Sequence, residues 1–546
     1  MVRNKHQQRI LAVLWIGRVF AAALLVLSPA LPQTPSPSVN DTVRVTTHLV
    51  QINVVVTDHA GNPVQRLMKD NFTLLDQGKQ RIISSFSTGD LKATAASAPH
   101  PPERSSQASK LATNRPPLIT DGGSQPTVLL FDMYNTKGED QIYAKQQILR
   151  FLRQISSQDR IAIYALTPRG FALVHDFSDS PESLASSVDK LTPRLNPLMY
   201  PPGLFATGQP GLDQAINAAN GDLAYFDSNN QALDSSKSLQ AIANHLAGIP
   251  GRKNMIWISA AFPLGLAQLF GVEFDYLTQA VRTLATANVA VYPIDARGLL
   301  VPPMADVSSP LPLAPDRAPL GTQLDDRNFA AMQYIARETG GEAIYNRNDI
   351  WSSIRRAIAD SAASYTLGYY VSESDWDGRF HTIKVKANRP GLIVRTKVGY
   401  FATKPHPLDA PSLEQTANNA TWSPVDSTAI GIVARLDADP ASPAMRHVFF
   451  AVRPSDVQFT QKDRRYLAAL DVWFVLRSGD GIPAARYQKS IDISATADEM
   501  KIWAGKGLIV YDNLTLGSGT ESLRIIVIDR RSGAYGSLTL PVSARN

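Results

Sequence analysis

The stretch PTVLLFDMYNT at residues 126–136 decides how the rest of the chain is interpreted. Its apolar run at 128–131 is short and follows a turn-rich segment, which is typical of a strand buried on both faces of a parallel sheet. The run ends on Asp132, and the carboxyl end of a central parallel strand lies beside the crevice where open α/β sheets bind ligands. We therefore expect Asp132 to be a site residue, whereas Asn135 and Thr136 could each equally well be a site residue or a cap of the next helix.

From residue 126 to residue 362, short apolar runs alternate with helical patterns. Strand-like runs recur at 160–166, 254–259 and 289–295, and the last of them also ends on an acid, Asp295. Repeated βα units of this length predict a doubly wound, mostly parallel sheet, so we expect an α/β fold.

Smaller segments flank this α/β region. Residues 43–88 alternate in the manner of short strands and predict an N-terminal β-sandwich-like module, while residues 363–402 predict an antiparallel β extension. Residues 423–546 are all-β by pattern and predict a C-terminal β domain. The stretches 89–125 and 403–422 are rich in proline and poor in large apolar residues, so we interpret both as linkers, the first of them disordered.

Residues 1–30 resemble a secretory signal peptide. Basic residues precede an apolar run at 19–27, and the small residues Ser28 and Ala30 follow it. We expect cleavage after about Ala30 and export to the periplasm, the envelope or the extracellular space. An uncleaved anchor is the alternative. We expect no further membrane span, because later apolar runs are too short.

Charge and cysteine content exclude several classes of function. The formal net charge is +6, but residues 1–30 hold four of the 54 basic residues and no acid, which leaves 50 basic against 48 acidic residues, or +2. A nearly neutral mature chain lacks the excess of positive charge that attracts nucleic acid. The chain has no cysteine, which excludes disulfides, thiolate metal ligands and cysteine nucleophiles.

Catalytic motifs are missing from the sequence. We find no GxGxxG, GxxxxGK[ST], HExxH or GxSxG pattern, and the nine histidines are scattered singly. We therefore expect a protein that is not an enzyme.

Several segments that follow one another in a fixed order resemble the von Willebrand factor A-related family (VWFA) of the acidobacterial type. The segments are VVVTDHAGNPV (54–64), LLFDMYNT (129–136) with Asp140 and Gln141 after it, GRKNMIWISAAFP (251–263), VAVYPIDARGL (289–299), SYTLGYY (364–370), RPGLIVRTKVGYF (389–401) and SLRIIVIDRRSGAYGSLTLPV (522–542). The resemblance implies an exported adhesive or scaffolding protein with a VWFA-like domain, whose partner is a protein or a cell-surface ligand.

The resemblance also implies a metal-ion-dependent adhesion site for Mg²⁺. That site uses Asp-x-Ser-x-Ser after the first strand, a later Thr, and an Asp after the fourth strand. Asp132 matches the first Asp and Thr136 stands in for the second Ser, so these two are the candidate metal ligands. Tyr134 replaces the first Ser, and Ser259 is followed by alanines instead of an Asp. We therefore expect a degenerate site with no cofactor, or at most weakly held Mg²⁺.

The strand order of that family would bring Asp132, Ser259 and Asp295 to one rim of the sheet. The rim would also include Asn135, Thr136 and Asp140. Two carboxylates there would offer a cation another way to bind. The alternative is that Asp295 caps its own loop by accepting N–H groups of residues 296–298.

Three functions follow from these observations. The first is an exported binding or adhesion protein, and the second is a structural envelope or matrix protein in which the site is vestigial. The third is a metal-assisted hydrolase that uses Asp132 and Asp295.

Overall fold

The computed structural model describes residues 48–88, 111–115, 125–156, 159–193, 209–260, 275–299, 320–362, 364–403, 407–442 and 444–542. The predicted signal peptide at 1–30 lies outside these residues. Among the helices that are described, none has the length and hydropathy needed to cross a membrane.

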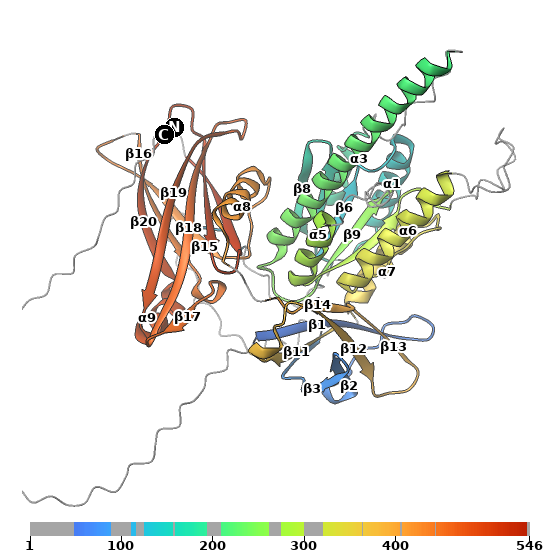
Figure 1. The fold of residues 1–546 in the computed structure, drawn as a ribbon, viewed down its shortest axis with the longest axis horizontal. Helices are drawn as coiled ribbons and strands as arrows, with labels where there is room; N and C mark the ends of the chain where they lie inside the picture. The colour runs from blue at the N-terminus through green and yellow to red at the C-terminus, as the bar shows by residue number, and fades with distance from the viewer. Residues whose placement is uncertain are drawn as a thin grey trace, which may run out of the picture. The chain divides into compact units, whose positions relative to one another are not determined.

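A five-stranded sheet forms the centre of the α/β region (Figure 1). Its strands are β6 (Thr127–Asp132), β7 (Ile161–Thr167), β8 (Gly170–Ser178), β9 (Lys253–Ser259) and β10 (Val289–Asp295). Their order is β10-β9-β6-β7-β8, and all neighbours are parallel except β7 and β8. The predicted mostly parallel α/β sheet is therefore present, and its strand order reverses between β6 and β9.

Helices cover both faces of this sheet because its strands are apolar on both faces. On β6, Val128 and Leu130 belong to one core, whereas Leu129 and Phe131 belong to the other. The first core includes residues of α3 (Pro210–Leu246), α5 (Asp275–Thr286) and α6 (Leu320–Thr339). The second core includes residues of α1 (Gly138–Leu152), α2 (Pro181–Asp189) and α7 (Ile350–Ala362). Because side chains alternate along each strand, successive residues contact opposite helical layers.

The N-terminal module and the β extension form one unit with a shared core. One sheet has the order β13 (Leu392–Thr396), β1 (His48–Asp58), β11 (Ser364–Val371), β4 (Ser85–Thr88). The other has the order β14 (Gly399–Phe401), β12 (Phe380–Ala387), β2 (Phe72–Asp76), β3 (Lys79–Arg81). The short 3-10 helices η1 (Lys69–Asn71) and η6 (Glu373–Asp375) lie in its connections. The described residues of the two predicted modules, 48–88 and 364–402, therefore are not separate pieces, because β1 can be enclosed on both edges only when the later strands are present.

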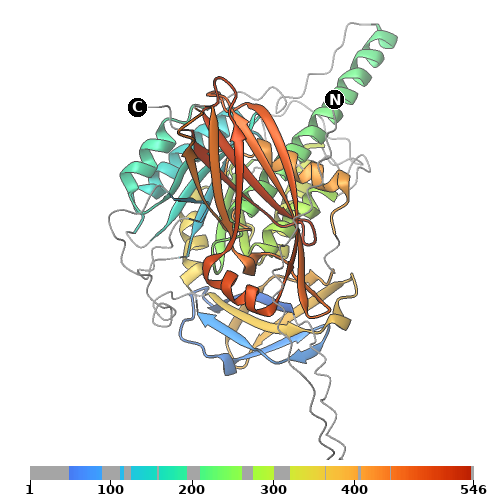
Figure 2. The same ribbon diagram turned by 90° about the vertical axis from the view of Figure 1, so that its left-hand side faces the viewer.

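The C-terminal β domain also has two antiparallel sheets, seen in Figure 2 as orange and red strands. The first has the order β20 (Leu508–Thr515), β16 (Met445–Val452), β15 (Ile432–Ala438), β5 (Ala112–Thr113). The second has the order β17 (Thr460–Lys462), β18 (Arg465–Arg477), β21 (Ser522–Asp529), β22 (Tyr535–Pro541), with β19 (Pro483–Ala495) paired to β18. Its helices are α9 (Ala497–Lys506) and the 3-10 turn η7 (Pro454–Asp456).

Both predicted linkers contain ordered elements. Within 89–125, the described residues 111–115 include β5, which pairs with β15, and Asn114 is buried and bonded to the backbone around Ile430. Within 403–422, the structure has α8 (Ala410–Trp422), which is capped by Asp409. The linker prediction at 403–422 is corrected here, because α8 packs through small alanines that leave no strong apolar pattern in the sequence.

Candidate functional site

Three of the predicted site residues lie side by side at the carboxyl ends of adjacent strands. Asp132 ends β6, Ser259 ends β9 and Asp295 ends β10, and Asp295 is paired in register with Ser259. Asp132 and Ser259 follow the paired residues Phe131 and Ile258. Since the strand order reverses between β6 and β9, this rim is the switch point at which open α/β sheets bind ligands.

The carboxylate of Asp132 is buried and accepts four hydrogen bonds. Its Oδ2 atom accepts from Asn135 Nδ2 at 2.8 Å, from Ser259 Oγ at 2.9 Å and from Trp257 Nε1 at 3.0 Å. Its Oδ1 atom accepts from the backbone N–H of Asn135 at 2.9 Å. Three of these four bonds end on Oδ2 and one on Oδ1, so Oδ2 is crowded with donors and Oδ1 keeps capacity for one more. Burial raises the pKa of Asp132, and the hydrogen bonds from Asn135, Ser259 and Trp257 oppose that rise.

Helix α3 covers the loop that follows Asp132. Asn135 Nδ2 donates to Ser235 Oγ of α3 at 3.0 Å, and Gln231 Nε2 of the same helix donates to the carbonyl oxygen of Tyr134 at 3.1 Å. Ser235 has no exposed surface. The crevice beside Asp132 is therefore closed by polar contacts from a helix, where the sequence predicted an accessible rim.

Asn135 and Thr136 are not helix caps in the structure, since Lys137 is the N-cap residue of α1 and its side chain makes no capping bond. Thr136 Oγ1 accepts from the backbone N–H of Ala260 at 3.0 Å and so joins the loop to the end of β9. Asp140 lies half-buried in the first turn of α1, and burial, followed by the neighbouring charge of Glu139, raises its pKa.

Asp295 is neutralised by a residue that sequence reasoning missed. Its Oδ1 atom accepts from the backbone N–H and Nε of Arg297 at 2.9 and 3.0 Å, and its Oδ2 atom accepts from Arg297 Nη2 at 2.8 Å. The loop-capping alternative is therefore present at the N–H of Arg297, with the guanidinium added to it. Trp257 was also missed, although its place two residues before Ser259 puts it on the same face of β9.

The arrangement around Asp132 does not fit an Mg²⁺ site. Mg²⁺ needs oxygen ligands with free lone pairs in octahedral geometry. N–H donors of Asn135 and Trp257 already occupy Oδ2 of Asp132, and Arg297 pairs with Asp295. The buried Oδ1 atom of Asn135 is an acceptor that has no hydrogen-bond partner among the described residues. The described part of the chain also holds no group of three or more His, Asp or Glu side chains placed to bind a metal.

The two strand-end carboxylates do not contact each other, since β9 lies between their strands. Asp132 and Asp295 end strands that are separated by β9, which corresponds to about 9–10 Å between their backbones. Acid and base partners act within hydrogen-bond reach of the reacting atoms. Both carboxylates accept hydrogen bonds from neighbouring protein donors, Asp132 from β9 and its own loop and Asp295 from Arg297.

No protein-family model matches the chain, and no curated protein matches it. Solved structures similar to part of it include proximal thread matrix protein 1 from the mussel byssus, with a TM-score of 0.25 and 11% identity over 44% of this chain. The match spans about half, 48%, of that protein's length. The SpRpn10 VWA domain matches with a TM-score of 0.17 and 12% identity, covering 31% of this chain and 88% of that domain. The human COPII-coat protein Sec24c matches with a TM-score of 0.24 and 8% identity, covering 51% of this chain and 43% of that protein. These TM-scores are too low for the likenesses to carry an argument about this chain.

Proposed function

We propose that this chain is an exported, non-enzymatic binding or scaffolding protein, with a doubly wound VWFA-like α/β domain between all-β domains and a metal site that has degenerated. The observation that carries the proposal is the carboxylate of Asp132, which accepts four protein hydrogen bonds at the position where a functioning site would coordinate Mg²⁺. The sequence segments that resemble the VWFA family support the domain assignment, and the pattern of residues 1–30 supports export.

The partner in this proposal is a protein or cell-surface ligand that is held without a metal bridge. Capture of partners from an envelope extract of the source cells, with and without a chelator, tests this. We expect the same partners to be retained under both conditions. Loss of a partner on chelation, with recovery on adding Mg²⁺, would overturn the metal-independent part of the proposal.

A structural matrix role, with a vestigial crevice, is the second candidate, and the contacts of α3 over the Asp132 loop favour it. Asp140→Asn at the half-buried rim separates the two, with Asp179→Asn as its control because Asp179 follows β8 at the opposite end of the sheet. Loss of capture in Asp140→Asn alone assigns binding to the rim, whereas unchanged capture in both variants favours the matrix role.

Export has its own test in mass spectrometry of the protein purified from its source cells. We expect the N-terminal peptide to begin near residue 31. An intact N-terminus in a cytoplasmic fraction would refute export.

A further inference from the structure

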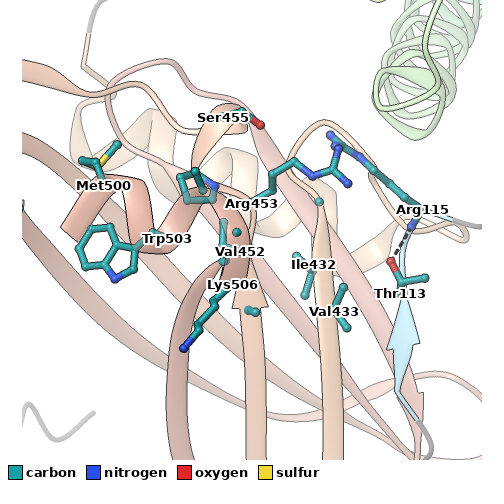
Figure 3. Close-up of a pocket in the computed structure, with 16 residues that line it drawn as sticks. Thr113, Arg115, Ile432, Val433, Val452, Arg453, Ser455, Met500, Trp503 and Lys506 are labelled. Carbon is teal, nitrogen blue, oxygen red and sulfur yellow. Dashed lines mark hydrogen bonds between the residues drawn. The ribbon is translucent and has the colours of Figure 1, made fainter. Parts of the chain in front are cut away.

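A cavity of about 680 Å³ opens in the C-terminal β domain, far along the chain from the Asp132 crevice (Figure 3). Its walls are the end of β16, the turn at 453–455, the start of β15 and the last turns of α9. Its volume lies in the range of sites that bind small molecules. Neither the VWFA resemblance nor the proposed function assigns it a role, so the inference below stands independently of them.

Positive charge exceeds negative charge in this cavity. Arg115 Nη1 pairs with Asp456 Oδ2 at 2.9 Å, and the same guanidinium donates to the carbonyl oxygens of Thr428 and Ala429. The side chain of Arg453, which also lines the cavity, forms no hydrogen bond or ion pair with the residues that the structure describes. The charged side chains that line the cavity are therefore all basic, and Asp456, which does not line it, pairs with Arg115 alone among the described residues.

The two guanidiniums are close enough to repel each other. Figure 3 shows the side chains of Arg115 and Arg453 converging, while that of Lys506 points away from them. Burial lowers the pKa of Arg115, Asp456 opposes this, and the charge of Arg453 lowers the pKa further. Arg453 is exposed, so an anion between the two groups would relieve this repulsion and replace water at the donors of Arg453.

Gly431 and Asp456 hold Arg115 in place at the cavity. The backbone N–H of Gly431 donates to Asp456 Oδ2 at 3.0 Å. A Cβ atom on Gly431 would lie 3.1 Å from Arg115 Nη1 and 3.2 Å from Asp456 Oδ2, so a side chain here would push the ion pair apart. These contacts fix the position of Arg115, whereas the side chain of Arg453 is exposed.

The opposite wall of the cavity is apolar. Met500 and Trp503 contribute from α9, and Trp503 packs partly against the domain core. A reciprocal capping box between Thr496 and Glu499 fixes the start of this helix. The cavity therefore offers a guanidinium fork at one end and an aromatic and thioether surface at the other.

We propose that this cavity binds a carboxylate that is attached to an apolar or aromatic group, with the carboxylate on Arg453 and the apolar group on Met500 and Trp503. The planar fork of an arginine matches a carboxylate through two parallel hydrogen bonds. Asp456 would repel a dianion more strongly than a monoanion, which favours a carboxylate over a phosphate. Such groups occur in free organic acids and at the C-terminus of peptides.

Fluorine NMR with 4-fluorobenzoate as the probe tests the proposal on the whole mature chain. We expect saturable line broadening that 4-fluorobenzamide, the neutral analogue, does not produce. Arg453→Gln should weaken binding tenfold or more, which corresponds to about 1.4 kcal/mol. Arg435→Gln is the matched control, because Arg435 is on the same sheet but pairs with Asp437 outside the cavity.

The folded state of Arg453→Gln is checked by its melting temperature, which should be no lower than that of the wild type, because no ion pair is lost and the repulsion with Arg115 is removed. An N-acetylated tripeptide that ends in phenylalanine, as free acid and as amide, shows whether the carboxylate of a chain terminus is also accepted. Equal binding of acid and amide probes, wild-type affinity in Arg453→Gln, tighter binding of phenylphosphonate, or no binding of 4-fluorobenzoate would each overturn the proposal.

Discussion

At the scale of the residue, Asp132 joins the end of β6 to β9 and to the loop that follows it. Its partners are Asn135, three residues away, and Trp257 and Ser259, which are more than a hundred residues away. Replacing this carboxylate would leave several buried donors without an acceptor. Such groups carry most of the cost when one partner of a buried hydrogen bond is removed.

Asp132→Ala should therefore lower the free energy of unfolding by about 3–5 kcal/mol, since each unpaired buried donor costs about 1–3 kcal/mol. Urea unfolding measures this loss. Asp140→Ala is the control and should cost less than about 1 kcal/mol, because Asp140 is only half-buried.

Adding about 1 mM Mg²⁺ should leave the wild-type melting temperature unchanged, since a ligand stabilises only when its concentration approaches Kd. A rise of several degrees that Asp132→Ala abolishes would show a working metal site.

Lys253 is a second buried ionisable group, and its effect on the pH dependence of stability can be measured. It begins β9 with its Nζ atom bonded to the carbonyl oxygen of Ile249 at 2.8 Å, and burial lowers its pKa to about 7. Between about pH 7 and pH 10 the unfolded chain keeps this proton and the folded protein does not. Stability through Lys253 therefore rises with pH in this window, by about 1.4 kcal/mol per pH unit.

Comparison of the wild type with Lys253→Met in urea at about pH 7 and about pH 9 tests this. The difference in unfolding free energy should shift by about 2 kcal/mol in favour of the wild type at the higher pH, because methionine does not titrate. A difference that is independent of pH would contradict a lowered pKa.

The site could be predicted from sequence only where the signal is local. Asp132 was identified because it directly follows a buried apolar run, and Asp295 was identified in the same way. The side chains that donate hydrogen bonds to Asp132 could not all be predicted, because the contact with Trp257 depends on how two distant strands pair. Arg297 is two residues from Asp295, yet spacing alone does not distinguish a paired arginine from an exposed one.

At the scale of the element, α8 shows why helices rich in small residues escape detection. Its buried residues Ala417 and Ala420 contact Trp473 and Val475 of β18 and residues of β21. Small side chains let the helix approach the sheet closely. The sequence pattern of 403–422 contains few large apolar residues, so apolar periodicity predicted no helix there.

Ala420→Leu should destabilise the chain by about 1–3 kcal/mol, because added methylene groups in a close contact force side chains or backbone to shift. Gln415→Leu on the exposed face of α8 is the control and should change stability by less than about 0.5 kcal/mol. Thermal unfolding of both variants measures the difference. Equal stability of the two variants would mean that α8 does not pack as described.

At the scale of the whole molecule, the α/β sheet was predictable and the unit built from β1 to β4 and β11 to β14 was not. Each strand of the α/β sheet is a buried run that ends at a turn, and its βα connections restrict the possible topologies. The other unit combines strands whose pairing spans the whole α/β region, from His48 with Val371 to Asp58 with Leu392. No local sequence pattern indicates which of these distant strands pair.

A chain that begins at residue 111 should consequently lose stability and aggregate, because β11 would lose β1 and β4 from its two edges. An unpaired apolar strand is a template for pairing with another chain. A chain that begins at residue 46 keeps β1 and is the control. Light scattering after size-exclusion chromatography should find aggregates only for the shorter chain, and a monodisperse, equally stable shorter chain would contradict the shared core.

The same pairing imposes a delay on biosynthesis. β1 is made about 300 residues before its partner β11, which begins at Ser364. At about 5–20 residues per second, this interval lasts roughly 15–60 s. Throughout it, the apolar side of β1, with Val50, Ile52 and Val54, has no native strand to pair with. An apolar strand without its partners is a template for pairing with other chains, so the interval before β11 is made is the period in which the nascent chain is most exposed to misassembly through β1.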